Sequence, residues 1–510
     1  MSKNNDGEKR RCPGENYDIT PAICKARQRN RYPKCLLCDW HELEQDESAD
    51  SDPRVPSDIF RSGEVLGEVP SEVDEYVMRK VGGATAQLLR AGSSKAGRIM
   101  VGHDLRSSSR KLTSALSEGI NQGGLDAVSG GIMPQEVLNY VVATSDMVGG
   151  AYVTGGNHPA DVNGARLMDS TARRMDFDGG LDKIGLICRR RGSGHSRSPG
   201  GRSFADPMED YRSCVQKFVP ELGECNVVVD GAAGLAGRTV PYVFEGLPAE
   251  LAGYNMDAEK GDNFLGQVFP AEKVLKKFQR PTRIKDADLC AAFDFAADRV
   301  VFFDEGGGRV RQDAAASLLA RELLRRHGGG VMVYDLRASA AFRETVSQAG
   351  GTPVSSPTDR LSVARQMRQT DALYATDLQG RPYFQGFYRS NSPVVALLLM
   401  CSIVSRADKT MSELVAEVTR YHHSGEIKIE TPSPGAADEA LEAVDEYYRD
   451  ADRERKDGLT VRFPKWWFNL RNIDDQPELR LNVEGRTEED ERSGRREILR
   501  LVKKAAKRAG

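Results

Sequence analysis

The sequence predicts an α/β protein built from three α/β domains and a smaller C-terminal α+β domain, behind a cysteine-rich N-terminal module. Three observations predict this architecture. At 510 residues the chain is too long for one hydrophobic core, so several domains are expected. From residue 58 onward, apolar runs typical of buried strands alternate with helical stretches, which is the pattern of layered α/β domains. Beyond residue 455, apolar and polar residues alternate with period two, as in an antiparallel sheet.

The predicted elements follow this pattern in chain order. Buried strands are predicted over 97–104, 225–234, 292–305 and 329–336. Amphipathic helices are predicted over 72–91 and 314–327. A further helix is predicted over 438–455, followed by the alternating segments LTVRFP, WWFNLR and ELRLNVEGR.

Composition indicates a soluble globular protein, with 39% hydrophobic and 29% charged residues. A net charge of −3 supplies no whole-molecule field that would attract nucleic acid or acidic membranes. No apolar run approaches the ~18 residues needed to cross a bilayer, so no membrane contact is expected. The basic start of the chain has no apolar segment behind it, and five of the nine cysteines are scattered singly. We therefore expect a cytoplasmic protein.

The other four cysteines, Cys12, Cys24, Cys35 and Cys38, lie together in residues 1–45. Cys35 and Cys38 form a CxxC pair, a spacing that lets two thiolates reach one tetrahedral Zn²⁺, and His41 could replace Cys12 or Cys24. A segment this short has too little apolar area to fold alone, so a bound metal would supply what a core cannot. We expect zinc in preference to an iron–sulfur cluster. The alternative is four free thiols on a loose tail. Residues 46–57 form a polar linker to the main body.

Four segments then occur in a characteristic order, and together they resemble the α-D-phosphohexomutases, specifically the bacterial phosphomannomutase/phosphoglucomutase branch. The segments are VGHDLRSSS (101–109), VTGGNHPADVNG (153–164), AFDFAADR (292–299) and WWFNLRNIDDQPELRLNVE (466–484). The resemblance covers about 59–488. It implies four domains around a central cleft, which we expect at 58–204, 205–309, 310–410 and 411–510.

The resemblance also implies a chemistry. Members of this family carry a phosphoserine that passes its phosphate to a sugar phosphate and recovers the other phosphate from the bisphosphate. Mg²⁺ is held by three aspartates and a phosphoserine oxygen. A sugar-binding loop lies in the third domain, and in the fourth an arginine and hydroxyl groups hold the non-reacting phosphate.

This sequence departs from the family at the reacting centre. Gly156 occupies the position of the nucleophilic serine, and Asn157-His158 replaces the family's His-Asn. In the metal loop Asp294 and Asp298 are present, but Ala296 replaces the middle aspartate, so magnesium binding is expected to be weak or absent. Leu66 and His103 stand where the family has arginines.

The two binding loops have changed as well. In ATDLQGR (375–381) Asp377 replaces a glutamate, Gln379 a serine and Arg381 a histidine. In RNIDDQP (471–477) Ile473 and Asp475 replace the two hydroxyl residues. The remaining candidates for substrate binding are Asp377, Arg381, Arg471 and Arg480. The alternative for these arginines is simple pairing with Asp377 or Asp475.

These changes leave three functions to be weighed. The favoured one is a pseudoenzyme that binds a phosphosugar or another anionic ligand, or serves as an interaction platform. The second is an enzyme with altered chemistry in which His158 carries the phosphate and Asp294 and Asp298 hold a weak Mg²⁺. A loop histidine bonded to the backbone is the plainer interpretation of His158. The third is conventional phosphoglucomutase or phosphomannomutase activity.

A basic loop, CRRRGSGHSRSPGGR (188–202), is the remaining sequence feature that points to a partner. Its arginines on a Gly/Ser-rich background are typical of contacts with phosphate or nucleic acid, and equally of a solvated flexible connector. Together with the cysteine module, this loop predicts a protein or nucleic-acid partner. The oligomeric state is left open.

Overall fold

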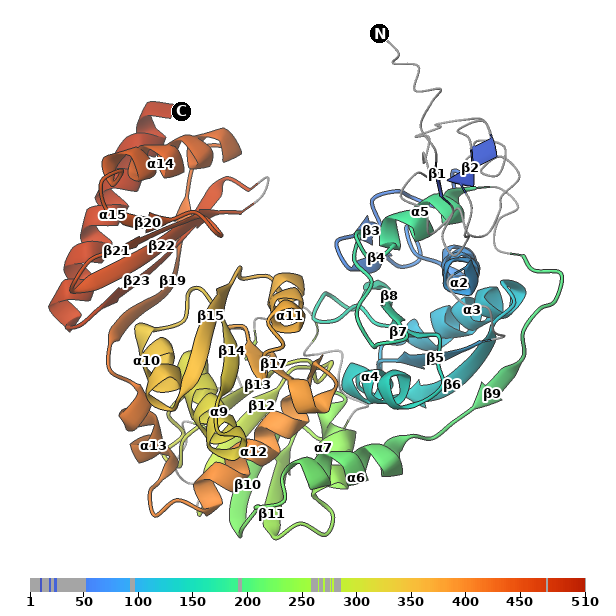
Figure 1. Cartoon of the computed structure of the whole chain (residues 1–510), viewed down its shortest axis with the longest axis horizontal. Coiled ribbons are helices and arrows are strands. Elements are labelled where there is room, and N and C mark those ends of the chain that lie inside the picture. The colour runs from blue at the N-terminus through green and yellow to red at the C-terminus, as the bar shows by residue number, and fades with distance from the viewer. Residues whose placement is uncertain are drawn as a thin grey trace.

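The computed structural model describes residues 52–91, 97–190, 195–257, 286–473 and 476–509, together with residues 10–11, 18–19, 23–24, 265, 269–270, 276 and 278. Four sheets follow one another along this part of the chain, and we call the units built around them domains I to IV (Figure 1). Near the N-terminus, β1 (Arg10–Arg11) and β2 (Asp18–Ile19) form an antiparallel pair. In Figure 1, domains II and III lie between domain I on one side and domain IV on the other.

Domain I is a seven-stranded sheet in the order β3-β4-β8-β7-β5-β6-β9, with parallel strands at its centre. Helices α2, α3 and α5 pack on one hydrophobic face, and α4 lies on the other. A Cβ on Gly119 of α3 would lie 1.9 Å from the carbonyl oxygen of Arg79 on α2, so glycine lets these helices touch. The bounds are β3 (Phe60–Arg61), β4 (Glu64–Glu68), α2 (Glu75–Ala91), β5 (Arg98–His103), α3 (Ser109–Gln122), β6 (Asp126–Ile132), α4 (Gln135–Thr144), β7 (Gly149–Val153), β8 (Val162–Asp169), α5 (Leu181–Arg189) and β9 (Arg202–Phe204).

Domain II has a four-stranded sheet in the order β11-β10-β12-β13. Strands β10, β11 and β12 run parallel, and β13 returns antiparallel to β12. The bounds are α6 (Met208–Phe218), β10 (Cys225–Asp230), α7 (Ala236–Phe244), β11 (Ala249–Tyr254), β12 (Leu289–Phe293) and β13 (Val300–Phe303).

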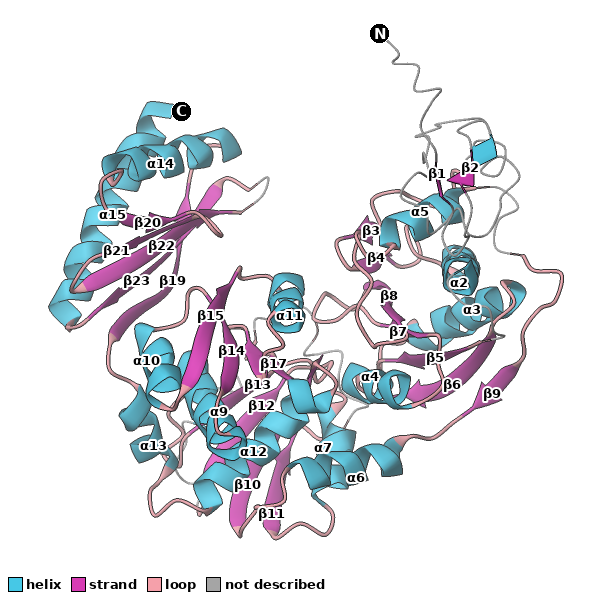
Figure 2. Ribbon diagram, in the orientation of Figure 1, coloured by secondary structure: helices cyan, strands magenta, loops and turns pink. Residues whose placement is uncertain are grey.

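Domain III has a five-stranded sheet in the order β15-β14-β16-β17-β18. Its apolar helix α12 packs against β10, β12 and β13 of domain II, so the two domains share one hydrophobic core (Figure 2). The bounds are α9 (Gln312–His327), β14 (Gly330–Asp335), α10 (Ala340–Gln348), β15 (Gly351–Ser356), α11 (Arg360–Gln369), β16 (Tyr374–Thr376), β17 (Pro382–Phe384), β18 (Ser390–Asn391), α12 (Pro393–Ser405) and α13 (Met411–Val418).

Domain IV is an antiparallel sheet in the order β19-β23-β22-β21-β20, with α14 and α15 packed together and sharing its core. The alternating residues of β22 and β23 send every second side chain into that core, as the sequence predicts. The bounds are β19 (His422–Glu430), α14 (Pro434–Tyr447), β20 (Asp452–Glu454), β21 (Leu459–Arg462), β22 (Trp466–Asn472), β23 (Glu478–Gly485) and α15 (Glu488–Ala509).

The predicted fold class is confirmed, and two predicted elements are corrected. The strand predicted over 292–305 is two antiparallel strands, β12 and β13, because the chain turns at 294–299, where Ala297 has a φ of 53°. The helix predicted over 438–455 ends at Tyr447, and residues 452–454 form β20. The chain doubles back there, and Arg455 Nε donates to Asp445 Oδ2 of α14 at 2.8 Å.

The second half of the basic loop 188–202 is tied to domain I. Gly200 N donates to Asn121 O at 2.8 Å, and Ala127 N donates to Gly201 O at 3.0 Å. The loop then continues into β9 at the sheet edge beside β6. For residues 195–202, a flexible connector is therefore the wrong prediction. In the part of the chain that the structure describes, no helix is long and apolar enough to span a bilayer.

Domain I meets the shared core at a buried carboxyl group. Glu136 of α4 accepts a hydrogen bond from Ser392 Oγ, the N-cap of α12. Burial raises the pKa of Glu136 to about 8, against the opposing effect of the Ser392 hydrogen bond. The carboxyl group is therefore mainly protonated at neutral pH, and its ionisation would place an uncompensated charge at this junction.

We predict that Glu136 makes the protein less stable as the pH rises from about 5 to 8. A carboxyl pKa that is higher in the folded than in the unfolded state means that the folded protein binds the proton more tightly, so stability is lost as pH rises through that range. Glu136→Gln should flatten the dependence of Tm on pH and should unfold at a higher temperature than wild type at pH 9. The exposed Glu439→Gln is the control. A Glu136→Gln profile parallel to that of wild type would contradict the prediction.

Candidate functional site

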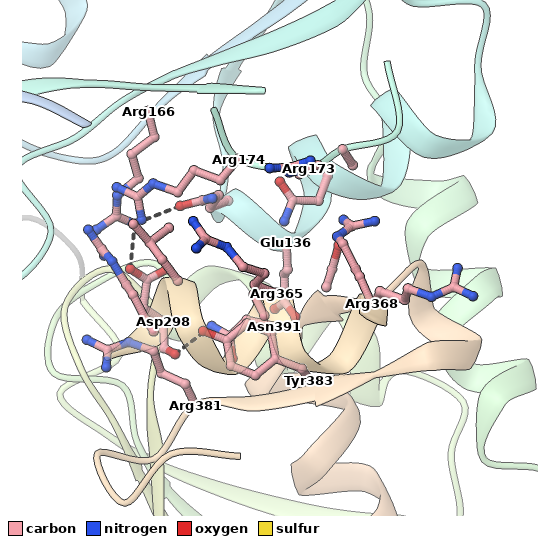
Figure 3. Close-up of a pocket in the computed structure, with 18 of the residues that line it drawn as sticks. Glu136, Arg166, Arg173, Arg174, Asp298, Arg365, Arg368, Arg381, Tyr383 and Asn391 are labelled. Atoms are coloured by element: carbon pink, nitrogen blue, oxygen red, sulfur yellow. Dashed lines mark hydrogen bonds and ion pairs between the residues drawn. The ribbon is translucent and has the colours of Figure 1, made fainter. Parts of the chain in front are cut away.

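A pocket lies where domains I, II and III meet, with about 850 Å³ of empty space including its open mouth. Domain I contributes the start of α4 and residues from the segment 166–176, domain II contributes residues 297–298, and domain III contributes α11 and the segment 381–391. Figure 3 shows arginines of domains I and III directed into the same space. The arginines that line the pocket are Arg166, Arg173, Arg174, Arg360, Arg365, Arg368, Arg381 and Arg389.

The loop at 153–164, which takes the place of the family's nucleophile loop, is held by Arg106. Its guanidinium donates to four loop carbonyls, including those of Gly156 at 2.9 Å and His158 at 2.7 Å. Thr154 Oγ1 donates to Asp104 Oδ2 at 2.7 Å and accepts from Gly156 N at 2.8 Å. The only hydroxyl group in this loop is thus bonded inside the loop, where it holds the turn in shape.

Gly156 itself is buried and has a φ of 57°, a left-handed conformation that favours glycine. A Cβ on this residue would lie 2.7 Å from Arg166 Nη2. The space in which a side chain would begin at the nucleophile position is therefore taken by the Arg166 guanidinium.

The same guanidinium also contacts the loop 294–299, which corresponds to the metal loop of the family. Arg166 Nη1 lies 2.6 Å from Asp298 Oδ2 and also donates to Gln135 Oε1 at 2.6 Å (Figure 3). Arg166 Nε lies 3.3 Å from Glu64 Oε2. A cation-binding carboxylate is thereby paired with an arginine, Ala296 supplies no ligand, and no phosphoserine exists to complete the set. Within the described residues, no three His, Cys, Asp or Glu side chains are grouped to hold a metal ion. The residues present do not fit Mg²⁺.

The two remaining aspartates of this loop behave differently. Asp294 Oδ1 accepts hydrogen bonds from the backbone N–H groups of Asp298 at 2.7 Å and Arg299 at 3.1 Å, so it closes the turn. Burial, reinforced by the charge of Asp298, raises the pKa of Asp294 to about 6. Burial also acts to raise the pKa of Asp298, but the Arg166 guanidinium outweighs it and holds that pKa below its ordinary value.

Positive charge is in excess beside this network. Glu64 receives Arg174 Nη2 at 2.6 Å and Arg360 Nη2 at 2.7 Å, so a single carboxylate faces these two arginines as well as Arg166. Burial lowers the pKa of Arg174 and of Arg360, and the neighbouring guanidinium groups lower both further. Buried charges are stable when they are paired, so an anion bound here would relieve the excess.

Of the two substrate-binding residues predicted in the loop 375–381, only Arg381 lines the pocket. Arg381 lines the pocket, with Nη1 at 2.8 Å from Asp377 Oδ2 and 2.9 Å from Gln379 Oε1. Asp377 is buried, and its other oxygen accepts from the backbone N–H groups of Gln379 and Arg381. Asp377 therefore orients Arg381, as the pairing alternative anticipates, and does not line the pocket.

The predicted ligands of domain IV lie elsewhere. Arg471 Nη2 is 2.7 Å from Glu426 Oε2, and Arg480 pairs with Glu426 and Glu478. Glu426 also pairs with Arg337 of domain III at 2.7 Å, so it joins the two domains. Neither Arg471 nor Arg480 lines the pocket, and their partners are glutamates of β19 and β23. Residues 474–475, and with them Asp475, lie outside the described residues.

Two further predicted sites are placed only in part. His158 lies on the exposed part of its loop and does not line the pocket; partial desolvation of its ring lowers its pKa, which favours the neutral imidazole at pH 7. Cys12, Cys35 and Cys38, with the alternative ligand His41, lie outside the described residues. Cys24 is buried and packs against Ile19.

Sequence reasoning missed most of the arginines in the pocket. Arg360, Arg365 and Arg368 lie on one face of α11, together with Leu361 and Ala364. Arg360, Ala364 and Arg368 are spaced four residues apart and so lie along one side of a helix, a signal that was available in RLSVARQMR. Arg166, Arg173 and Arg174 carried no such signal, because only the fold brings β8 and the turn after it opposite α11.

Comparisons with known proteins agree with this architecture. The family models described as "Phosphoglucomutase/phosphomannomutase, alpha/beta/alpha domain I" and "alpha/beta/alpha domain III" match residues 57–178 and 311–421. A protein of Escherichia coli (strain K12) named phosphomannomutase is 28% identical over 447 residues, which are 84% of this chain and 94% of the relative. A protein of Xanthomonas campestris pv. campestris named phosphohexose mutases is 28% identical over 436 residues, 84% of this chain and 95% of the relative.

Solved structures share the fold. A phosphoglucomutase/phosphomannomutase family protein from Burkholderia thailandensis superposes with a TM-score of 0.76 at 22% identity, covering 89% of this chain and 99% of its own. Parafusin, a phosphoglucomutase from Paramecium, superposes with a TM-score of 0.72 at 14% identity, covering 87% of this chain and 94% of its own.

We predict that Gly156→Ala destabilises the protein by more than its backbone conformation alone explains. A left-handed φ costs an alanine about 1–2 kcal/mol, and here the new Cβ must also push Arg166 away from Asp298. Gly425→Ala is the matched control, because Gly425 has a φ of 71° and a Cβ there meets nothing within 4 Å. The free energy of unfolding, measured in urea, should fall further for Gly156→Ala than for Gly425→Ala. Equal losses in the two variants would contradict the role of Arg166.

Proposed function

The chain belongs to the α-D-phosphohexomutase superfamily, and on that premise we propose that it binds a phosphorylated sugar among domains I to III without transferring the phosphate. The observation that carries the proposal is the position of Arg166. Its guanidinium takes the space beside Gly156 where a nucleophilic side chain would begin, and it neutralises Asp298, a ligand that the family uses for Mg²⁺. Residue 156 therefore carries no hydroxyl group and Asp298 is already paired with an arginine, so both requirements of the family's phosphoryl transfer are unmet.

Binding without transfer is consistent with the charges that remain. The Arg174–Arg360 pair on Glu64 leaves a buried positive excess, and Arg381 is oriented toward the pocket by Asp377. Guanidinium groups with fixed orientation bind phosphate oxygens through two parallel hydrogen bonds. Residues of domains I and III therefore bind the phosphorylated ligand, although the pocket does not transfer its phosphate.

A second candidate is a working mutase, and the names of the curated relatives favour it. Those relatives are called phosphomannomutase or phosphohexose mutase, and the similarity extends over 84% of this chain. Because no serine is present at position 156, such an enzyme needs another nucleophile. His158, with a neutral imidazole, is the residue in this loop able to carry a phosphoryl group.

The deciding experiment measures turnover and binding on the same preparation of the full chain. A coupled mutase assay with glucose 1-phosphate and mannose 1-phosphate, Mg²⁺ and a bisphosphate activator should give no turnover. Isothermal titration should show glucose 1-phosphate binding with the same Kd in Mg²⁺ and in EDTA, because Arg166 already neutralises Asp298. Arg360→Gln should weaken binding by roughly tenfold or more, the effect of losing a hydrogen bond to a charged group.

The variant His158→Ala separates the two candidates. Turnover that disappears in His158→Ala would overturn the proposal and assign the phosphate to that histidine. Turnover that persists unchanged in His158→Ala would indicate a contaminating host mutase. The contaminant would be removed by further purification and the comparison repeated. If the wild-type chain does not bind glucose 1-phosphate, the binding part of the proposal is wrong.

The cysteine module is a separate proposal that rests on the sequence. Cys12, Cys24, Cys35 and Cys38 are proposed to hold a structural zinc and, with the basic loop 188–202, to contact a protein or nucleic-acid partner. Elemental analysis of the purified chain should find about one zinc per molecule, and Cys35→Ser/Cys38→Ser should abolish it. A chain that is metal-free after purification without chelators would contradict the site.

A further inference from the structure

The pocket has two ends that differ in how their charges are balanced. We call the side of Arg174 and Arg360, which share Glu64, the Arg360 end, and the side of Arg173, Arg368 and Arg389 the Arg368 end. Arg360 and Arg368 lie eight residues apart on α11, so they are about 12 Å apart along the helix axis. In the view of Figure 3, Arg173 and Arg368 lie on one side of the pocket, and Arg166, Asp298 and Arg381 on the other.

Arg368 is the uncompensated charge at its end. Arg365 pairs with Asp176 at 2.9 Å and with Asp178 at 3.2 Å, and Arg389 pairs with Asp371. Within the part of the chain that the structure describes, the Arg368 guanidinium makes no ion pair or side-chain hydrogen bond, although the residue is partly buried and lines the pocket. A partly buried guanidinium that lines a pocket and has no carboxylate partner favours the binding of an anion.

Asp169 is the carboxylate whose charge acts on Arg368, and within the described residues the two form no ion pair. Burial lowers the pKa of Arg368; the charge of Asp169 raises it, and Arg389 and Arg173 lower it again. The Oδ1 atom of Asp169 already accepts hydrogen bonds from Thr171 and from the backbone N–H of Arg173. Arg173 itself approaches Asp176 only at 3.7 Å, so the two arginines leave a positive excess between domains I and III.

Between the two ends, the pocket presents hydrogen-bond acceptors that lack donors. Asn139 is 7% exposed, and its Oδ1 is buried without a partner among the described residues. Asn391 donates from Nδ2 to the carbonyl of Asp298 at 2.7 Å, and within the described chain its Oδ1 is also buried and unpartnered. Both residues line the pocket. Unpaired buried amide oxygens call for donors, and the hydroxyl groups of a sugar are donors of the right kind.

We propose that the Arg368 end is a second anion subsite, so that the ligand of this pocket is a hydroxylated molecule with an anionic group at each end. The Arg360 end holds one anionic group, Asn139 and Asn391 face the hydroxyl-bearing middle, and Arg368 with Arg173 holds the other. The inference rests on the proposed function, because it assigns the ligand class of the same pocket. It also accounts for domain IV, whose Arg471 and Arg480 are neutralised by Glu426 and Glu478 and leave the second anionic group to α11.

Isothermal titration of the full chain with two probes tests this subsite. Wild type should bind glucose 1,6-bisphosphate at least tenfold more tightly than glucose 1-phosphate. Arg368→Gln should weaken glucose 1,6-bisphosphate at least fivefold more than glucose 1-phosphate and so remove most of that preference, and Arg368→Lys should restore part of it. Arg360→Gln should instead weaken both probes.

Arg309→Gln is the matched control. Arg309 lies outside the pocket, burial lowers its pKa as it does that of Arg368, and its loss also removes one positive charge. It should leave both Kd values unchanged. Circular dichroism and Tm values equal to wild type establish that each variant is folded.

The outcomes separate this inference from the proposed function. If wild type binds both probes equally, or if Arg368→Gln weakens both by the same factor, the second subsite is wrong and binding at the Arg360 end stands. If neither probe binds wild type, the proposed function fails, and the subsite fails with it. If the bisphosphate preference depends on Arg368 in a chain that also shows mutase turnover, the subsite stands and binding without transfer is overturned.

Discussion

One guanidinium group, that of Arg166, fixes the arrangement on which the pocket depends. It pairs with Asp298 of domain II at 2.6 Å and with Glu64 of its own domain at 3.3 Å, and Glu64 in turn receives Arg360 of domain III at 2.7 Å. Three domains are therefore linked through two carboxylates and two arginines that are largely buried. Because breaking one partner of a buried ion pair strands the other charge, these contacts tolerate little change in domain position.

The same guanidinium lies against residue 156 and against Asp298 in the loop that contains Ala296. A side chain at residue 156 would collide with Arg166, and a divalent cation beside Asp298 would be repelled by it. Gly156 leaves room for this guanidinium, and Asp298 and Glu64 supply the negative charge with which a buried arginine must be paired. The loop shape survives because Arg106 and Asp104 hold its backbone and its threonine, and neither of them depends on the missing serine.

Positive charge is balanced in domain IV and in excess between domains I and III. In domain IV, Glu426 and Glu478 neutralise Arg471 and Arg480, and Glu426 also forms an ion pair with Arg337 of domain III. The unbalanced arginines lie on α11 and on the turn after β8, which face each other across the pocket. Anion binding is thereby concentrated between domains I and III.

The sequence by itself determined the fold class, most of the strands and helices, and the absence of a serine at position 156, because periodicity and residue identity are local properties. It also singled out Asp298 and Arg381, each in a recognisable loop, and both residues line the pocket. It did not separate β12 from β13, since a tight turn at Ala297 leaves the apolar run unbroken. Only the tertiary structure decided which charges meet. Arg166, Glu64, Arg360 and Arg368 come from separate segments, and Asp377 and Arg471 gain partners that neutralise them. Whether an arginine binds a ligand or pairs with a carboxylate depends on distances of a few ångströms between distant segments, and no local pattern encodes those distances.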